Sequence, residues 1–140
     1  MLVWDKEQMG MGFPWRAQHE LVAFAKRSAA RMGDGKKGNV LKCPRTKNDL
    51  HPTQKPVGLI EAILANEPGA NLFDPFIGSG TTLIAAETIG KNCFAVDVMP
   101  TYCDVTIRRW QAFSGGTATL EGNGRAFADI ETERGLSHAA

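Results

Sequence analysis

The segment Leu72–Thr82 carries residues whose types and order suit the binding of a nucleotide-like ligand. An apolar run ends in Asp74, and the turn Gly78-Ser79-Gly80 then leads into a segment of helical character. Glycines at such a turn allow tight bending and a close approach of the backbone to a ligand. Parallel α/β sheets present ligands at the carboxyl end of a strand in this way. The segment therefore predicts a ligand site, although a purely structural strand–turn–helix connection would have the same pattern.

An acidic residue after the next apolar run narrows the class of ligand. Asp97 lies 17 residues after Gly80, near the spacing at which a carboxylate binds both ribose hydroxyls of an adenosine group. Leu83 stands where a dinucleotide pattern has its third glycine, and the chain has no Gly-Lys-Thr/Ser phosphate loop. The pattern favours a nucleoside ligand without a pyrophosphate, and it disfavours a nicotinamide-dependent oxidoreductase.

The elements that must position these residues alternate between strands and helices. Apolar runs predict strands over residues 1–4, 19–25, 71–76, 92–98 and 117–120, and helices begin at Pro56, Thr81 and Pro100. This alternation predicts an α/β fold with a mainly parallel sheet flanked by helices. We expect one domain over residues 1–140, with a polar tail over 121–140. Trp110 is expected in the core, and Met9, Met11, Phe13 and Trp15 are expected to pack on the sheet rather than to line a base pocket.

Composition excludes several classes of function. No apolar run approaches the roughly 20 residues of a membrane span, so we expect no membrane partner. The three cysteines show no metal spacing, which suggests reduced thiols and a cytoplasmic protein. His19 and His51 have no evident third ligand, so no metal site is expected.

Positive charge is concentrated in residues 26–50, which we interpret as a basic loop. Nine basic and only two acidic residues lie between Lys26 and Lys55. Such a loop can follow a phosphate backbone, although a solvated loop without a partner would have the same composition. The candidate DNA contacts are Lys36, Lys37, Lys42, Arg45 and Lys47.

Three blocks of the sequence resemble the DNA amino-methyltransferases, which methylate the exocyclic nitrogen of adenine or cytosine with S-adenosylmethionine. The blocks are His51-Pro52-Thr53-Gln54-Lys55-Pro56, the run from Asp74 to Thr82, and the segment from Gly90 to Tyr102 that contains Asp97. They occur in the order typical of that family, which more often has Glu at the position of Asp97. The resemblance covers most of residues 1–113, and it implies a Rossmann-like methyltransferase fold that is incomplete here.

The resemblance also implies roles for single residues at the cofactor. Asp74 would hold the ammonium group of the methionine part, and Lys55 would meet its carboxylate. Thr53 and Gln54 would hydrogen-bond the cofactor or, alternatively, cap a helix. Phe76 would pack on the cofactor or, equally, belong to the core. The remaining candidates are the backbone donors Gly78 and Gly80, with Thr81 and Asp97.

The catalytic loop of that family is missing from this chain. The loop has the pattern Asp/Asn/Ser-Pro-Pro-aromatic and holds the target amino group of a flipped base. Asp74-Pro75-Phe76 lacks the second proline and belongs to the glycine motif. We therefore expect the loop to precede Met1, so that the chain is a truncated gene product, a fragment or one half of a split enzyme. The chain alone is expected to be inactive or to act as a binding module. A missing part of the sheet also predicts an uncovered edge, with dimerisation or poor solubility.

Overall fold

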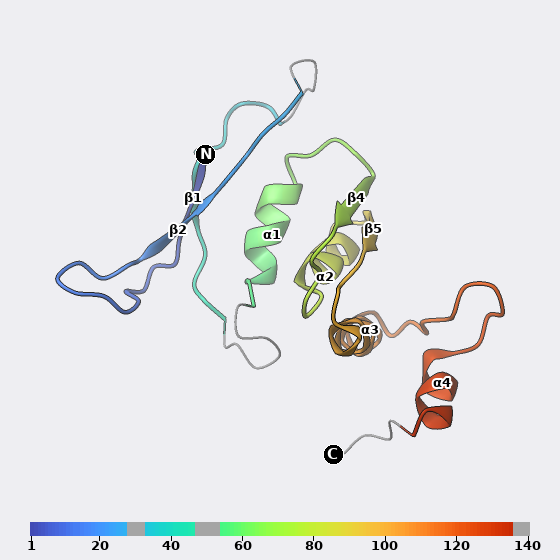
Figure 1. Ribbon diagram of the computed structural model, residues 1–140. Coiled ribbons are helices and arrows are strands. Elements are labelled where there is room, and N and C mark those ends of the chain that lie inside the picture. Colours follow the sequence, from blue (N-terminus) through green and yellow to red (C-terminus); the bar gives the residue numbers. More distant parts are fainter. Residues whose placement is uncertain (28–32, 47–53, 136–140) are drawn as a thin grey trace.

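The computed structural model describes residues 1–27, 33–46 and 54–135 (Figure 1). Two candidate residues, Lys47 and Thr53, lie outside these ranges, as does His51. In chain order the elements are β1 (Leu2–Asp5), β2 (His19–Val22), β3 (Val40–Lys42), α1 (Val57–Leu64), β4 (Asn71–Asp74), α2 (Thr81–Thr88), β5 (Asn92–Ala95), α3 (Pro100–Ser114) and α4 (Phe127–Glu133). The alternation of strands and helices confirms the predicted α/β class.

The strands form two separate sheets among the described residues, where the sequence predicted a single one. In the first sheet β1 lies between β2 and β3. Its pairing with β2 is antiparallel, with Asp5 opposite His19, and its pairing with β3 is parallel, with Asp5 opposite Lys42. In the second sheet β4 and β5 are parallel, with Phe73 opposite Phe94. Helix α1 lies between the two sheets (Figure 1).

The unit β4–α2–β5 positions the glycine turn. Gly80, with φ 82°, is the N-cap of α2, and Gly90, with φ 69°, follows its end as predicted. The strands β4 and β5 end at Asp74 and Ala95, so Phe76 and Asp97 lie in the loops that follow them rather than in the strands.

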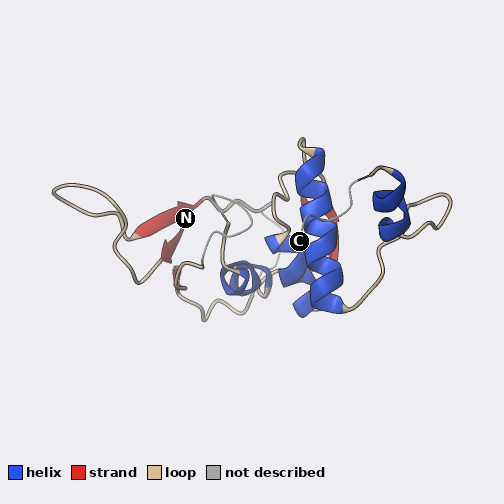
Figure 2. Cartoon of the chain, turned by 90° about the horizontal axis from the view of Figure 1, so that it is seen from below, coloured by secondary structure: helices blue, strands red, loops and turns tan. Residues whose placement is uncertain are grey.

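Two predictions about other segments were wrong. The range 26–50 is not loop throughout, because Val40–Lys42 pairs with β1 as strand β3. Residues 117–120 do not form a strand, since only an isolated bridge joins Thr119 to Ala126. The expected short helix in the C-terminal segment is α4, which Figure 2 shows at the far end of the molecule from β1 and β2.

The core is small, and much apolar surface is exposed. Trp4, Leu59, Ile84 and Ala85 are buried, whereas Phe73 and Phe94 on the second sheet are 65% and 60% exposed. The predicted uncovered apolar surface is therefore confirmed. The packing expected for the loop after β1 was wrong, because Met9, Met11, Phe13 and Trp15 are all exposed. Trp110 is only partly buried, so it is not the core residue that was expected. Over the described part of the chain, no helix has both the length and the apolar character needed to cross a membrane.

Candidate cofactor-binding site

A cavity of about 220 Å³ lies at the carboxyl end of β4, where the glycine turn leads into α2. Six of the residues singled out in the sequence meet there, although they come from separate segments of the chain. We call it the motif cavity; it is lined by Gln54, Lys55, Ile60, Asp74, Phe76, Ile77, Gly78, Ser79, Thr81 and Thr82. Open α/β sheets bind their ligands at this edge.

The glycine turn is held by the protein's own acceptors. The amide of Gly78 donates to Oδ2 of Asp97 at 2.8 Å, and the amide of Gly80 donates to the carbonyl of Ile77 at 3.0 Å. The two amides therefore already have acceptors within the protein, and their role as donors to a cofactor stays a prediction. Gly78 forms part of the cavity wall, and Gly80 lies outside its lining.

Helix α3 supports the turn from behind through two side chains that the sequence analysis did not single out. Thr106 donates from Oγ1 to the carbonyl of Gly78 at 2.8 Å, and Arg109 donates to the carbonyl of Ser79 at 2.8 Å. Partial burial lowers the pKa of Arg109 from its ordinary value. The two residues are three apart on one helix, a spacing that places them on one face and was the available signal in the sequence.

Asp97 and Asp74 each accept a hydrogen bond from the backbone two residues later. Oδ1 of Asp97 accepts from the amide of Met99 at 2.9 Å, and Oδ1 of Asp74 accepts from the amide of Phe76 at 2.9 Å. Asp74 lines the motif cavity, whereas Asp97 is not part of the lining and is bonded to Gly78, which is. A carboxylate offers about four lone-pair sites, so both side chains keep the capacity to accept further donors.

Gln54 contributes a buried acceptor to the motif cavity. Its Oε1 atom is buried, and no described residue donates a hydrogen bond to it. An unsatisfied buried carbonyl costs about 1–3 kcal/mol, so such atoms usually mark a missing partner. Nearby, Oγ1 of Thr81 donates to the carbonyl of Lys55 at 3.3 Å and ties this segment to the start of α2.

Lys55 also belongs to a cluster of charges at the end of β1. Its Nζ lies 3.0 Å from Oε2 of Glu20, and Nζ of the buried Lys6 lies 3.3 Å from Oε1 of the same carboxylate. Both ammonium groups lie over the ring of Trp4, at 5.5 and 5.8 Å from its centroid. Partial burial alone would raise the pKa of Glu20, but the hydrogen bonds from Lys55 and Lys6 outweigh it, and the pKa is lowered. No local sequence pattern indicates this cluster, because its members are distant in the chain.

Phe76 projects into solvent at the rim of the cavity. Its side chain is 84% exposed, which removes the alternative that it is a core aromatic. A contact with a bound ligand remains the other prediction for this residue.

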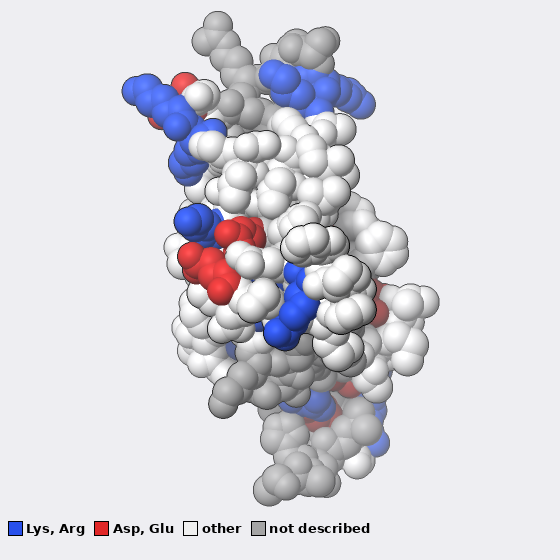
Figure 3. Space-filling model, turned by 90° about the vertical axis from the view of Figure 1, so that its left-hand side faces the viewer, with Lys and Arg blue, Asp and Glu red and all other residues white. Residues whose placement is uncertain are grey.

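Four of the five candidate DNA-contacting residues lie in the described part of the chain, on both sides of β3 in the sequence. Lys36 and Lys37 precede β3, while Lys42 ends it and Arg45 follows; all four are exposed. Figure 3 views the molecule from the left-hand side of Figure 1, and on that face the Lys and Arg side chains form separate groups rather than one stripe. Within residues 1–27, 33–46 and 54–135, no cluster of three or more His, Cys, Asp or Glu side chains has the geometry to hold a metal ion.

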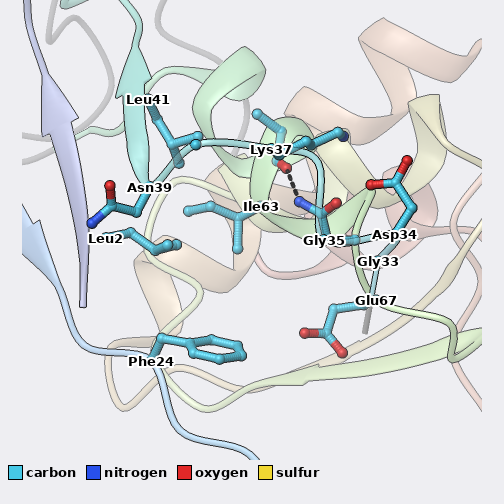
Figure 4. A pocket seen from close by; sticks show the side chains of 13 residues that line it. Leu2, Phe24, Gly33, Asp34, Gly35, Lys37, Asn39, Leu41, Ile63 and Glu67 are labelled. Carbon is cyan, nitrogen blue, oxygen red and sulfur yellow. Dashed lines mark hydrogen bonds between the residues drawn. The ribbon is translucent and has the colours of Figure 1, made fainter. Parts of the chain in front are cut away.

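A second cavity, of about 230 Å³, lies between the first sheet and α1 (Figure 4). Leu2, Leu41 and Ile63 form its apolar side, and Asp34 and Glu67 lie at its polar side (Figure 4). Its lining contains no residue of the three motif blocks. It also lies near the amino end of β1, away from the edge at which open α/β sheets bind ligands.

Comparison with known proteins decides the family. The sequence model of the DNA methylases with N6 or N4 specificity matches residues 3–108. The chain belongs to this DNA methylase family. Members are S-adenosylmethionine-dependent methyltransferases, so the family predicted from the three motif blocks is confirmed.

Relatives of the family member described here include type II methyltransferases. M2.DpnII of Streptococcus pneumoniae is 38% identical over 64 residues, which are 44% of this chain and 24% of that protein. M.BglII of Bacillus subtilis is 34% identical over 71 residues, which are 49% of this chain and 19% of that protein. The chain thus matches about a quarter or less of each of these relatives.

Solved structures share the fold. The crystal structure of the M1.HpyAVI complex with S-adenosylmethionine has a TM-score of 0.64 and 24% identity, covering 77% of this chain and 59% of that one. A protein of Thermus thermophilus in complex with S-adenosyl-L-methionine has a TM-score of 0.50 and 21% identity, covering 82% and 53%. The predicted partial Rossmann-like methyltransferase fold is confirmed.

Proposed function

We propose that this chain forms the cofactor-holding part of a DNA amino-methyltransferase that uses S-adenosylmethionine. The observation that carries the proposal is the motif cavity, in which a buried acceptor without a donor, Gln54 Oε1, lies with the opposite charges of Asp74 and Lys55. The methionine part of the cofactor carries one ammonium and one carboxylate group. The donor and acceptor set of the cavity therefore fits this zwitterion.

The residues of the cavity have complementary tasks in this proposal. Asp74 pairs with the ammonium group, Lys55 with the carboxylate, and Gln54 accepts a hydrogen bond. Phe76 covers the ligand from the rim, while Thr81 keeps Lys55 in place through its backbone. Asp97 accepts the ribose hydroxyls and shapes the turn through Gly78. Thr53, outside the described residues, belongs to the same block and adds a hydroxyl.

The cofactor supplies a methyl group on a sulfonium, which is transferred to the amino nitrogen of adenine (N6) or cytosine (N4) in DNA. Holding both reactants in line contributes much of the rate of such a transfer. In this proposal, exposed basic residues on both sides of β3 in the sequence neutralise DNA phosphates. They are Lys36 and Lys37 before β3, Lys42 at its end and Arg45 after it, with Lys47 as a further candidate.

A second candidate function is a binding module that needs another chain for catalysis. The sequence favours it, because no Asp/Asn/Ser-Pro-Pro-aromatic segment occurs among the 140 residues. In this version the chain holds cofactor and DNA, and a partner or preceding segment supplies the groups that hold the target amino group.

Calorimetric titration with S-adenosylmethionine tests the proposed site. Asp74→Asn removes the charge in the motif cavity and should weaken binding about tenfold or more, as expected for a lost charged hydrogen bond. Asp34→Asn is the matched control, because it removes a carboxylate from the second cavity. Binding that is lost with Asp34→Asn and kept with Asp74→Asn would place the ligand in the wrong cavity for this proposal.

Transfer of a labelled methyl group to mixed-sequence DNA separates the two candidate functions. We expect no incorporation by the chain alone, and incorporation when a second chain with the Pro-Pro-aromatic loop is added. Methylation by the purified chain alone would show that it is a complete catalyst, and would refute the binding-module version.

A further inference from the structure

The connection between β1 and β2 is a defined hairpin rather than a loose loop. Beyond the paired strands, the amide of Lys6 donates to the carbonyl of Gln18 at 3.0 Å, and the amide of Gly10 donates to the carbonyl of Ala17 at 2.7 Å. Nε of Arg16 donates to the carbonyl of Gly10 at 2.7 Å and closes the tip. These hydrogen bonds fix the course of the hairpin, and Figures 1 and 2 both show it projecting away from the rest of the chain.

Two glycines hold the tip in this conformation. A Cβ at Gly10 would lie 2.8 Å from the carbonyl oxygen of Ala17, and one at Gly12, where φ is 144°, would lie 2.7 Å from that of Trp15. Neither distance is compatible with a side chain. The tip is therefore built as a close-packed backbone turn whose side chains face outward.

The side chains at this tip are apolar and almost wholly in solvent. Met11, Phe13 and Trp15 are 93%, 97% and 89% exposed, and Met9 is 61% exposed. Folding gains nothing from them, since burial of apolar surface is what stabilises a fold. A contiguous exposed apolar group of this kind marks an interaction site. We call these four residues the apolar tip.

An ion pair joins the base of the hairpin to the lining of the motif cavity. Glu20, at the start of the return strand, is paired with Lys55, which lines the cavity. Lys42 lies opposite Asp5 at the root of the hairpin, and Arg45 follows shortly after. Lys42, an exposed cation, therefore lies at the base of the apolar tip. Two acidic residues also lie at this root: Asp5, whose Oδ1 accepts hydrogen bonds from the amide of Glu7 and from the side chain of Gln18, and Glu7, which is exposed.

From this arrangement we propose that the apolar tip inserts between DNA bases next to the target, while Lys42 and Arg45 contact the flanking phosphates. This inference rests on the proposed function, in that it takes DNA as the substrate. Aromatic and thioether side chains can stack on bases or wedge a base step open, and cations beside them neutralise the backbone. A second copy of this chain fits less well, because a stable interface needs about 20–30 residues on each side and the tip offers a handful.

The test uses fluorescence anisotropy with two DNA duplexes of equal length that differ only in one central mismatch. A wedge prefers the mismatched duplex, where unstacking costs less. Phe13→Ala and Trp15→Ala should each weaken binding about tenfold and reduce that preference, since base–aromatic stacking contributes roughly 1–3 kcal/mol. Phe94→Ala is the matched control, as it removes an exposed aromatic from the second sheet, and it should leave binding unchanged.

Two further readouts separate this inference from the proposed function. Titration with S-adenosylmethionine should give the same affinity for wild type and Trp15→Ala. If the wild type does not bind the cofactor, the proposed function is wrong, whereas the inference about the apolar tip is not affected. Lys42→Ala should weaken binding to both duplexes equally and lower the salt dependence of binding. Unchanged DNA affinity in both tip variants would overturn the inference, as would a dimer that Trp15→Ala converts to a monomer in light scattering.

Discussion

Asp97 and Gly78 are joined by a hydrogen bond of 2.8 Å from the Gly78 amide to the carboxylate Oδ2. The acidic residue after β5 is therefore also a structural part of the turn after β4. This relationship couples the shape of the motif cavity to the residue that the sequence assigns to the ribose. It also means that a substitution of Asp97 acts on the turn and on the ligand together.

Asp97→Ala should weaken binding of S-adenosylmethionine by about ten- to a hundredfold, because charged hydrogen bonds contribute roughly 1.5–3 kcal/mol each. Calorimetric titration measures the effect, and circular dichroism checks that the fold is kept. Asp97→Glu restores a carboxylate and should recover most of the affinity. Equal affinities for wild type and Asp97→Ala would remove Asp97 from the site.

Gly80→Ala should destabilise the chain by about 1–3 kcal/mol, the usual strain of a side chain at positive φ, with a clash in addition. A Cβ there would lie 2.9 Å from Cγ2 of Thr106. Gly124→Ala is the control, since it has φ 67° but nothing within 4 Å, and it should show the strain alone. Urea unfolding measures both. Adding Thr106→Ser, which deletes Cγ2 and keeps the hydroxyl, should recover part of the loss in Gly80→Ala.

Glu20→Gln should destabilise the chain at pH 7 by about 1–2 kcal/mol, a value discounted for solvent screening of a half-exposed carboxylate. The substitution leaves the buried Lys6 without its ionic partner. Because the folded pKa of Glu20 is lowered from 4.5, its contribution is fully present above that pH and is lost as pH falls through the folded pKa. Urea unfolding at several pH values should therefore show the difference between wild type and Glu20→Gln shrinking below about pH 4.5. A difference that grows on acidification would contradict the assignment.

Phe94→Thr should reduce self-association of the chain, because Phe73 and Phe94 are cross-strand neighbours on an exposed apolar face. Threonine keeps the strand propensity at that position. Light scattering over a range of concentrations measures the effect, with Phe113→Thr on α3 as the control for loss of an exposed aromatic. Identical association of the two variants would show that the second sheet is not the contact surface.

The parts that could be predicted from sequence are those set by local chemistry. The turn from Asp74 to Thr81 follows from two glycines between an apolar run and a helix, and Gly90 marks the end of α2 because it takes a left-handed conformation. Strand β3 could not be found in this way. Its three residues lie among basic and glycine residues, and they become a strand only through pairing with β1.

Contacts between distant segments account for the remaining misses. Thr106 and Arg109 hold the turn from α3, and their shared helix face does not by itself show which segment they contact. The charge cluster of Lys6, Glu20 and Lys55 joins residues from three segments of the chain. The prediction that the apolar tip packs on the sheet was wrong for a different reason. Apolar side chains normally indicate packing, but here the hairpin projects away from the sheet and leaves them exposed.

The two sheets share no backbone ladder in the described ranges, so their mutual placement depends on α1, which lies between them and packs on α2. The ion pair between Lys55 and Glu20 ties the segment before α1 to the first sheet. Regions with few buried apolar contacts open at lower free energy than well-packed ones, so we expect the contact between the sheets to open before either strand ladder. On warming, the protein should therefore lose the ability to bind a small-molecule ligand first, while its far-ultraviolet circular dichroism still indicates intact secondary structure.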